Sequence, residues 1–393
     1  MRSSDRGEQV EAGAPRRSAT SVAQGQVLAN DFARQWQSLR EDALDAMDRV
    51  GCSGWLVLGQ EVAGFERDLA SWWGVPHAVG VASGLDALEI ALRCAGVAEG
   101  ARVITTPLTA FATTLAIIRA GATPVWCDVD DSGGLDLDRV DAALRRDRSI
   151  RAVLPVHLYG HPLDPAALRR LAEEHEVVVI EDCAQSAGAE RDGRPTALAG
   201  TAAGTSLYPT KNLGAMGDGG VLLTSDAAVA ERARSLRDYG QSARYEHSEL
   251  GLNSRLDELH AAILRSALLP RLDGWLERRR EIAERYTAAL LGSRLRPIAS
   301  AGGRSAHHLY PVEVLEGNPA EVAEGLAARS IQVGRHYPFI CPDQRAVRGI
   351  GETIDELPVT RRMAERELSL PIHPHLHDEE VELVVEACLG VCG

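Results

Sequence analysis

Strand-like and helix-like segments alternate along the first half of the sequence. Short runs rich in valine and isoleucine predict strands, and the amphipathic stretches between them predict helices. Because consecutive parallel strands are joined by right-handed crossovers, this alternation predicts an α/β fold with a mainly parallel central sheet sandwiched by helices. In such a sheet, ligands bind beyond the carboxyl ends of the strands. The expected strands are 77–82, 102–106, 124–129, 152–156 and 177–180, with helices at 110–120 and 165–175.

The segments on either side of this unit indicate the domain organisation. Two helical patterns precede it, and a long helical region follows at 255–291. Beyond that region, strand-like segments at 309–315 and 331–333 and a final helix from Asp378 predict a smaller α+β domain. The expected division is therefore a mobile tail over 1–24, a large domain over 25–260 and a small C-terminal domain over 261–393.

Composition excludes several classes of protein. The formal net charge of −14 argues against a nucleic-acid partner, because phosphate contacts need clustered basic residues. No apolar run approaches the roughly 20 residues that span a bilayer, and no hydrophobic signal core is visible, so we expect no membrane partner and a cytoplasmic location. Seven cysteines without a C-x-x-C pair predict reduced thiols. The alternating His373, His375 and His377 suggest a metal site, but the prolines beside them favour a surface turn, and we expect no metal.

Lys211 lies in a glycine-rich turn. It follows a short apolar stretch and precedes four glycines, within the sequence GTSLYPTKNLGAMGDGGVLLT at 204–224. Such a turn lets the backbone approach a ligand closely. A lysine withdrawn from water favours the neutral amine, which attacks a carbonyl to form a Schiff base. Taken alone, this pattern fits a structural lysine in a hairpin better.

Three further features are expected at the same edge of the sheet. Asp182 follows a buried strand and needs a cationic partner, which a protonated pyridine nitrogen would provide. Gln185 lies three residues later, within reach of a phenolic oxygen on the same ring. Phe111 offers a face on which an aromatic ring can stack. Each of these residues also has a purely structural interpretation.

A phosphate site is predicted where the first strand turns into a helix. Ser83 and Gly84 begin that helix, and Ser83 with Asp86 fits a capping box. Free backbone N–H groups and the positive end of the helix bind phosphate well. Together with Lys211, Asp182 and Phe111, this helix end supplies the parts that a pyridoxal 5′-phosphate site requires.

Several longer motifs carry a family resemblance. The stretches IEDCAQSAGA, SLYPTKNLGAMGDGG, GLNSRLDELHAAIL, RHYP and LSLPIHP occur in this order between about residue 26 and the C-terminus. The sequence thereby resembles the DegT/DnrJ/StrS family of pyridoxal-phosphate-dependent sugar aminotransferases, which have the fold type I architecture of the aspartate aminotransferase superfamily.

The resemblance implies a role for each matching residue. Lys211 would form the Schiff base and then move the proton between cofactor and substrate. Asp182 would pair with the pyridine nitrogen, Gln185 would bond the ring hydroxyl, and Phe111 would stack on the ring. The remaining expected roles are phosphate binding by Ser83, Gly84, Leu85 and Ser206, with Leu85 in place of a common threonine; phosphate binding across a homodimer interface by Asn253; and sugar-nucleotide binding by His336 and Tyr337.

The reaction that the resemblance implies is amino transfer in two halves. L-glutamate would leave its nitrogen on the cofactor as pyridoxamine phosphate, and a nucleotide-linked keto-deoxyhexose, favoured as dTDP-linked, would take it up. Amination at C3 or C4 stays open, as does a cyclitol ketone of the scyllo-inosose type. Phe339 to Gln344 depart from the family pattern. A non-catalytic regulatory protein also stays open, whereas a dehydrogenase ranks last because the G-x-G-x-x-G motif is absent between strand and helix near residue 82.

Overall fold

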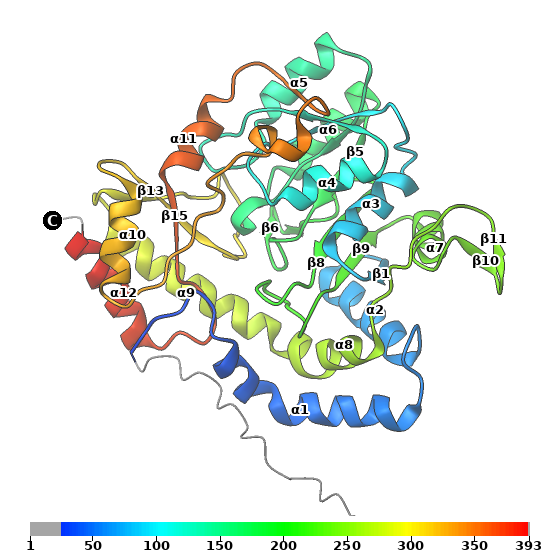
Figure 1. Ribbon diagram of the computed structural model, residues 1–393, viewed down its shortest axis with the longest axis horizontal. Helices are drawn as coiled ribbons and strands as arrows, with labels where there is room; N and C mark the ends of the chain where they lie inside the picture. The colour runs from blue at the N-terminus through cyan, green and yellow to red at the C-terminus, as the bar shows by residue number, and fades with distance from the viewer. Residues whose placement is uncertain (1–24, 392–393) are drawn as a thin grey trace, which may run out of the picture.

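An eight-stranded sheet forms the centre of the computed structural model, which describes residues 25–391 (Figure 1). The tail expected at 1–24 lies outside the described residues. The strand order is β1-β9-β8-β5-β4-β2-β3-β14, and every neighbouring pair is parallel except the two that involve β9. The predicted mainly parallel sheet is confirmed. The strands are β1 (His77–Val81), β2 (Arg102–Thr105), β3 (Thr123–Trp126), β4 (Ile150–Leu154), β5 (Val178–Asp182), β8 (Ala202–Ser206), β9 (Gly220–Thr224) and β14 (Glu352–Thr353).

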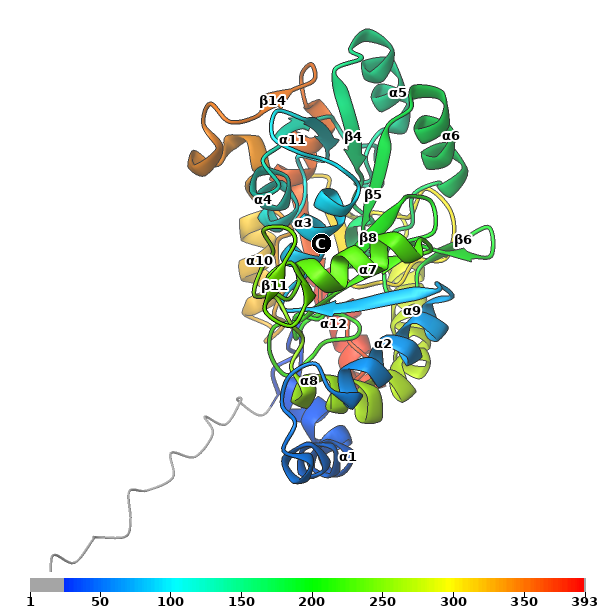
Figure 2. The ribbon, with the colours of Figure 1, turned by 90° about the vertical axis from the view of Figure 1, so that its right-hand side faces the viewer.

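Helices cover both faces of this sheet (Figure 2). Helices α3, α4 and α7 pack on one face, where Leu88 and Ile90 of α3 join Val79 of β1 in an apolar core. Helices α2 and α8 cover the other face near β1 and β9, and α5 and α6 cover it near β4 and β5. These helices are α2 (Gln60–Trp73), α3 (Gly84–Cys94), α4 (Phe111–Arg119), α5 (Leu137–Arg146), α6 (Pro165–His175), α7 (Ala227–Leu236) and α8 (Glu258–Ile263), and α1 (Phe32–Ser53) packs against α8.

A smaller three-stranded sheet, in the order β12-β13-β15, lies to one side of the large sheet (Figure 1). Its apolar core includes Tyr286, Leu368 and Val27 from the start of the described chain. The strand expected at 331–333 forms only an isolated bridge between Val27 and Ile331. The division at residue 260 stays a prediction. The elements here are α9 (Leu272–Leu290), β12 (Leu295–Pro297), β13 (Tyr310–Val314), α10 (Pro319–Ala327), α11 (Pro358–Arg366), β15 (Glu367–Leu370) and α12 (Asp378–Val391).

Two short hairpins lie outside the two larger sheets. They pair β6 (Glu190–Arg191) with β7 (Arg194–Pro195) and β10 (Gln241–Ala243) with β11 (Glu246–His247). None of the helices in the described part of the chain is long and apolar enough to cross a membrane.

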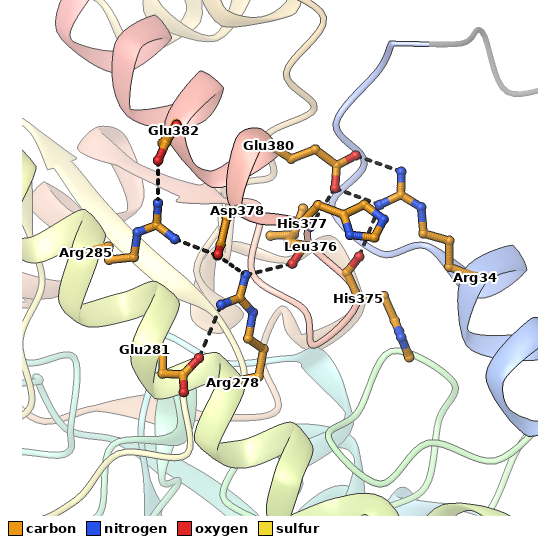
Figure 3. Close-up of polar contacts among 10 residues, drawn as sticks. All are labelled: Arg34, Arg278, Glu281, Arg285, His375, Leu376, His377, Asp378, Glu380 and Glu382. Atoms are coloured by element: carbon orange, nitrogen blue, oxygen red, sulfur yellow. Dashed lines mark hydrogen bonds and ion pairs between the residues drawn. The ribbon is translucent and has the colours of Figure 1, made fainter.

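Ion pairs fasten the start of α12 to its neighbours (Figure 3). Arg34 of α1 lies 2.6 Å from Glu380. Arg278 and Arg285, both on α9, lie 2.8 and 2.7 Å from the carboxylate of Asp378. These contacts connect the beginning of the described chain, the long helix α9 and the C-terminal helix.

The expectation of a surface turn before α12 is wrong for His373. This residue is buried, and its Nε2–H donates a hydrogen bond of 3.2 Å to the carbonyl of Leu28. His375 packs edge-on against Trp275 of α9, with 5.6 Å between ring centroids, while His377 is exposed. His373 is buried because this part of the turn runs between α9 and the segment that precedes α1.

Candidate active site

Two cavities meet at Lys211, which with Tyr208 lines both of them. The first has a volume of about 300 Å³ and lies at the carboxyl ends of β1, β5 and β8. The second has a volume of about 440 Å³ and lies between the Lys211 turn and the small sheet. The first cavity's polar and small lining residues include Ser83, Gly84, Thr109, Thr113, Asp182, Gln185, Ser206 and Lys211; the second's include Asn30, Thr210, His308, Gln332, His336, Tyr337 and Ser369.

The amino end of α3 forms one wall of the first cavity. Ser83 caps the helix by accepting a hydrogen bond of 3.1 Å from the N–H of Asp86. The carboxylate of Asp86 accepts a bond from Ser254 instead of completing a capping box. A Cβ on Gly84 would lie 2.7 Å from the Cβ of Ser206, so only glycine lets the helix end approach β8 this closely. The result is a concave end with free N–H groups, suited to a phosphate.

Asp182 is the last residue of β5 and is only 4% exposed. Its Oδ2 accepts a bond of 2.8 Å from the hydroxyl of Thr113, and its Oδ1 accepts one of 3.0 Å from the N–H of Ala184. Burial raises the pKa of Asp182, and the two hydrogen bonds and the nearby Lys211 oppose that rise. No ion-pair partner lies within salt-bridge distance of Asp182 among residues 25–391. A cation brought by a ligand would stabilise the ionised form.

Lys211 is the single lysine in the sequence of 393 residues. Its backbone N–H donates to the carbonyl of Tyr208 at 2.8 Å, which tightens the turn after β8. Burial lowers the pKa of Lys211 to about 8, and the charge of Asp182 partly offsets this effect. Within the described chain, the Nζ atom has no hydrogen-bond or ion-pair partner. A neutral amine is therefore accessible near neutral pH, free to react.

Gln185 is held in one orientation. Its Oε1 accepts a bond of 2.6 Å from the N–H of Tyr159, and its Nε2 donates one of 3.2 Å to the hydroxyl of Tyr337. The Tyr159 hydroxyl in turn donates to the carbonyl of His336 at 2.8 Å. These bonds connect the wall of the first cavity with residues that line the second.

Phe111 begins α4 but does not line either cavity in this structure. Its ring packs in a small cluster with Trp126, Cys341 and Val347. Its neighbours Ala110 and Ala112 do line the first cavity. The stacking role of Phe111 stays a prediction.

The divergent segment Phe339 to Gln344 lies over the beginning of α4. The N–H of Cys341 donates a bond of 2.8 Å to the carbonyl of Pro107, and Cys341 packs against Phe111. This part of the chain therefore supports the wall that carries Phe111.

Asn253 lies away from both cavities. It is exposed and forms an isolated bridge with Asp238 ahead of α8. Its side chain does not line the site of its own chain, so the expected contact across a dimer interface stays a prediction. Leu85, by contrast, lines the first cavity beside Gly84.

Sequence reasoning missed several residues of this site, among them Thr113, Tyr159 and His308. Thr113 donates to Asp182, Tyr159 orients Gln185, and His308 is buried beside the second cavity. Thr109 lies just before α4 and Thr113 in its first turn, with 3.1 Å between their hydroxyls, and this spacing of two threonines is a pattern that could have indicated polar side chains at the start of the helix. Tyr159 has a φ of 61°, a backbone conformation that its sequence pattern does not predict.

The residues of the first cavity fit pyridoxal 5′-phosphate. The buried carboxylate without a cation matches the ring nitrogen of that cofactor, and the free lysine amine matches its aldehyde. The glycine cradle at a helix end matches its phosphate. A Cβ on Gly220 would lie 2.2 Å from the carbonyl of Ser83, so the cradle depends on glycine at this position too.

Comparison with solved structures defines the class of the protein. The crystal structure of S. venezuelae DesV in complex with a ketimine intermediate superposes with a TM-score of 0.89 at 39% identity, covering 93% of this chain and 98% of that one. The fold and the site therefore define a pyridoxal-phosphate-dependent aminotransferase of fold type I.

The family follows from the sequence. The family model described as DegT/DnrJ/EryC1/StrS aminotransferase matches residues 37–389, and the chain belongs to this family. A dTDP-3-amino-3,4,6-trideoxy-alpha-D-glucose transaminase of Streptomyces venezuelae is 40% identical over 91% of this chain and 94% of its own. A UDP-N-acetyl-3-dehydro-alpha-D-glucosamine 3-aminotransferase of Acidithiobacillus ferrooxidans is 37% identical over 89% and 94%. A pleiotropic regulatory protein of Geobacillus stearothermophilus is 39% identical over 91% and 96%.

Proposed function

We propose that this aminotransferase moves the amino group of L-glutamate to a keto-deoxyhexose linked to dTDP. The observation that carries the proposal is the second cavity, of about 440 Å³, which opens on Lys211 beside the cofactor cavity and is large enough for a hexose. The 40% identity to a dTDP-sugar transaminase supports dTDP as the nucleotide.

The residues around the two cavities have different roles in binding and in proton transfer. When bound, pyridoxal phosphate supplies a ring that accepts electrons from the amino-bearing carbon. Asp182 keeps the ring nitrogen protonated, because its buried carboxylate is stabilised by that proton. Ser83, Gly84, Leu85 and Ser206 bind the phosphate at the end of α3, and Gln185 bonds the ring hydroxyl. We assign ring stacking to Phe111.

Lys211 exchanges protons with the carbon that gains or loses the amino group. A pKa of about 8 suits this role, because neutral amine and ammonium forms are both populated near neutral pH. His336 and Tyr337, on the other side of Lys211, contact the substrate in the second cavity. Their burial beside the turn excludes bulk water from the proton transfer.

A panel of substrates tests the nucleotide and the sugar. We expect L-glutamate-dependent formation of an amino sugar from dTDP-linked 3-keto- or 4-keto-deoxyhexoses, with kcat/KM at least about tenfold higher than for the UDP-linked counterparts. Mass spectrometry and NMR of the product identify the aminated carbon. Preference for a UDP-linked sugar, the class that the name of the A. ferrooxidans relative specifies, would overturn the dTDP assignment, and turnover of a cyclitol ketone alone would replace the sugar.

We also propose that two copies of the chain share their active sites. Exposed apolar side chains lie around α8 and the Lys211 turn, and Leu56 and Glu258 are joined by a backbone hydrogen bond of 3.3 Å. Burial of such a patch against a second copy would stabilise a two-fold dimer and bring Asn253 to the partner's phosphate. The apolar residues are Trp55, Leu56, Val57, Tyr208, Met216 and Leu259.

Mixed dimers test this arrangement. Lys211→Ala and Asn253→Ala chains are each expected to be inactive or strongly impaired. After mixing and subunit exchange, about a quarter of wild-type activity should return, because half of the dimers contain one complete site built from both chains. Activity no greater than the sum of the separate variants would show that Asn253 serves its own chain.

The cysteines bear on the proposed cytoplasmic location. Free thiols suit a reducing compartment, so these side chains support that location. Within residues 25–391, the free thiols include Cys52, Cys94, Cys127, Cys183 and Cys341.

A further inference from the structure

One face of strand β15 is apolar, and the opposite face carries two buried polar side chains. Leu368 and Leu370 pack in the core of the small sheet. Glu367 and Ser369 point the other way, toward the segment that contains His336, and are 1% and 3% exposed. Burying a carboxylate is costly unless it is hydrogen-bonded, so the partners of Glu367 are informative.

These partners form a continuous chain that ends at the substrate cavity. The Oε2 of Glu367 accepts a bond of 2.6 Å from the backbone N–H of His336, and its Oε1 accepts one from the hydroxyl of Ser369. The Oγ of Ser369 lies 2.8 Å from the Nδ1 of His336. Since the Ser369 hydroxyl donates to Glu367, its oxygen accepts from the Nδ1–H of His336. This fixes the tautomer of the imidazole.

The other ring nitrogen of His336 is available to a ligand. Its Nε2 makes no hydrogen bond to any residue between 25 and 391, and the ring lines the cavity of about 440 Å³ beside Lys211. The Tyr159 hydroxyl holds the His336 carbonyl, so the backbone of this residue is fixed from both sides.

We propose that Glu367 and Ser369 are positioning residues that set the hydrogen-bond polarity of His336 toward ligands in this cavity. With Glu367 ionised, Nδ1 carries the ring proton and Nε2 accepts. When Glu367 takes up one proton from solvent, its carboxyl donates to Ser369, the Ser369 hydroxyl donates to Nδ1, and the ring proton resides on Nε2, which then donates. The imidazole is neutral in both states. This inference rests on the proposed function, in which the cavity receives the amino donor and acceptor.

The charges around the chain place the change near neutral pH. Burial raises the pKa of Glu367 to about 7, against the opposing effects of the Ser369 and His336 hydrogen bonds and the charge of Arg335. Burial and the charge of Lys211 lower the pKa of His336 to about 4, so its ring stays neutral above that pH. Nε2 therefore donates below about pH 7 and accepts above it. The other ionisable groups facing this region in the described part of the chain include Tyr159 and Tyr337, both with pKa raised by burial, and Glu313 of β13, which pairs with Arg296 and Arg362. His308 lines the same cavity, and burial and the charge of Lys211 lower its pKa, so its ring stays neutral.

L-glutamate is the probe, because its carboxylate oxygens only accept hydrogen bonds. Its apparent dissociation constant is measured from the change in cofactor absorbance of the holoenzyme. In the wild type this constant should rise about tenfold as the pH increases through the pKa of Glu367. In Glu367→Gln the amide donates to Ser369 at every pH, so Nε2 of His336 donates at every pH as well. The ratio of the wild-type dissociation constant to that of the variant should therefore rise about tenfold over the same pH range. Loss of this difference in a His336→Phe background would confirm that it acts through the imidazole.

A matched control and a second measurement separate this role from a structural one. Glu313→Gln makes the same change on the residue opposite Glu367 in the β13–β15 ladder, outside the cavity, and should keep the wild-type pH dependence. Independently of substrate, the infrared carbonyl band of a protonated carboxylic acid should appear as the pH falls through about 7 and be absent from Glu367→Gln. Either a pH-independent ratio or the absence of that band from the wild type would overturn the proposal. Failure of amino transfer itself would instead leave the cofactor absorbance unchanged by glutamate at every pH.

Discussion

Replacing Lys211 with alanine is expected to lower amino transfer by at least about 10³-fold while the protein stays folded and still binds the cofactor. The reason is that Lys211 is the single amine side chain in the sequence and the residue at which both cavities meet. No neighbouring side chain in the described part of the chain offers a neutral amine that can exchange a proton at neutral pH. Steady-state kinetics with L-glutamate and a keto sugar, together with cofactor titration, measures both parts of the prediction.

Two further variants sharpen this result. Lys211→Arg keeps a positive charge in the turn but cannot provide a neutral amine, because the arginine pKa is too high, and it should be as inactive as the alanine variant. Methylamine added to Lys211→Ala should restore part of the rate by supplying the missing base. Wild-type turnover by the alanine variant would remove Lys211 from the chemistry.

Asp182→Asn is expected to lower kcat by about 10²-fold to 10³-fold with little effect on folding. Asparagine can still accept the bond from the N–H of Ala184, now 3.0 Å long, through its Oδ1. Its Nδ2 can donate to the hydroxyl oxygen of Thr113, which now lies 2.8 Å from the carboxylate. It cannot stabilise a proton on the ring nitrogen, so the cofactor would lose much of its capacity to accept electrons. Single-turnover kinetics of the glutamate half-reaction measures the loss.

Asp128→Asn provides the matched control. Asp128 is fully buried beyond the end of strand β3, which β4 and β2 separate from β5. It accepts bonds from Val359 and Thr360 at the start of α11 and lines neither cavity. This variant should lose stability by about 1–3 kcal/mol but keep kcat per folded molecule. Equal losses of kcat in both variants would show that Asp182 matters only for packing.

The sequence was sufficient for the parts of the fold that local patterns determine. Alternating apolar runs predicted the strands that end just before Ser83 and at Asp182, and the glycine-rich turn contains Lys211, which lines the same cavity. These predictions succeed because strand ends, caps and glycine turns are encoded by neighbouring residues.

Other features depend on residues far apart in the chain. Strand β15 was not predicted, because the alternation of Glu367 and Ser369 with leucines is short and its pairing partner β13 lies more than fifty residues earlier. Helix α11 was missed because its sequence, PVTRRMAER, is mostly polar, and it begins where Asp128 accepts its free N–H groups. Sequence patterns read one segment at a time cannot include a cap from another strand.

The same limit applies within the site. Phe111 was assigned to the cofactor ring from its position after a strand, yet its direction depends on Trp126 and on Cys341, from the segment that departs from the family pattern. Gln185 lines the first cavity, but its orientation is set by Tyr159 and Tyr337, and its bond to the cofactor ring stays a prediction. Contacts between residues far apart in the chain position the side chains that select the substrate. For this reason the identities of the nucleotide and of the sugar are proposed and were not predicted from local sequence patterns.

Borohydride reduction before and after exposure to L-glutamate tests the central claim most directly. Before glutamate, reduction should attach one cofactor per chain at Lys211, and peptide mass spectrometry can assign it without ambiguity because the sequence holds a single lysine. After glutamate, the cofactor should carry the amino group, release 2-oxoglutarate in equal amount, and no longer be fixed by reduction. Attachment that glutamate does not change, in folded and cofactor-loaded protein, would contradict the assignment of amino transfer to this site.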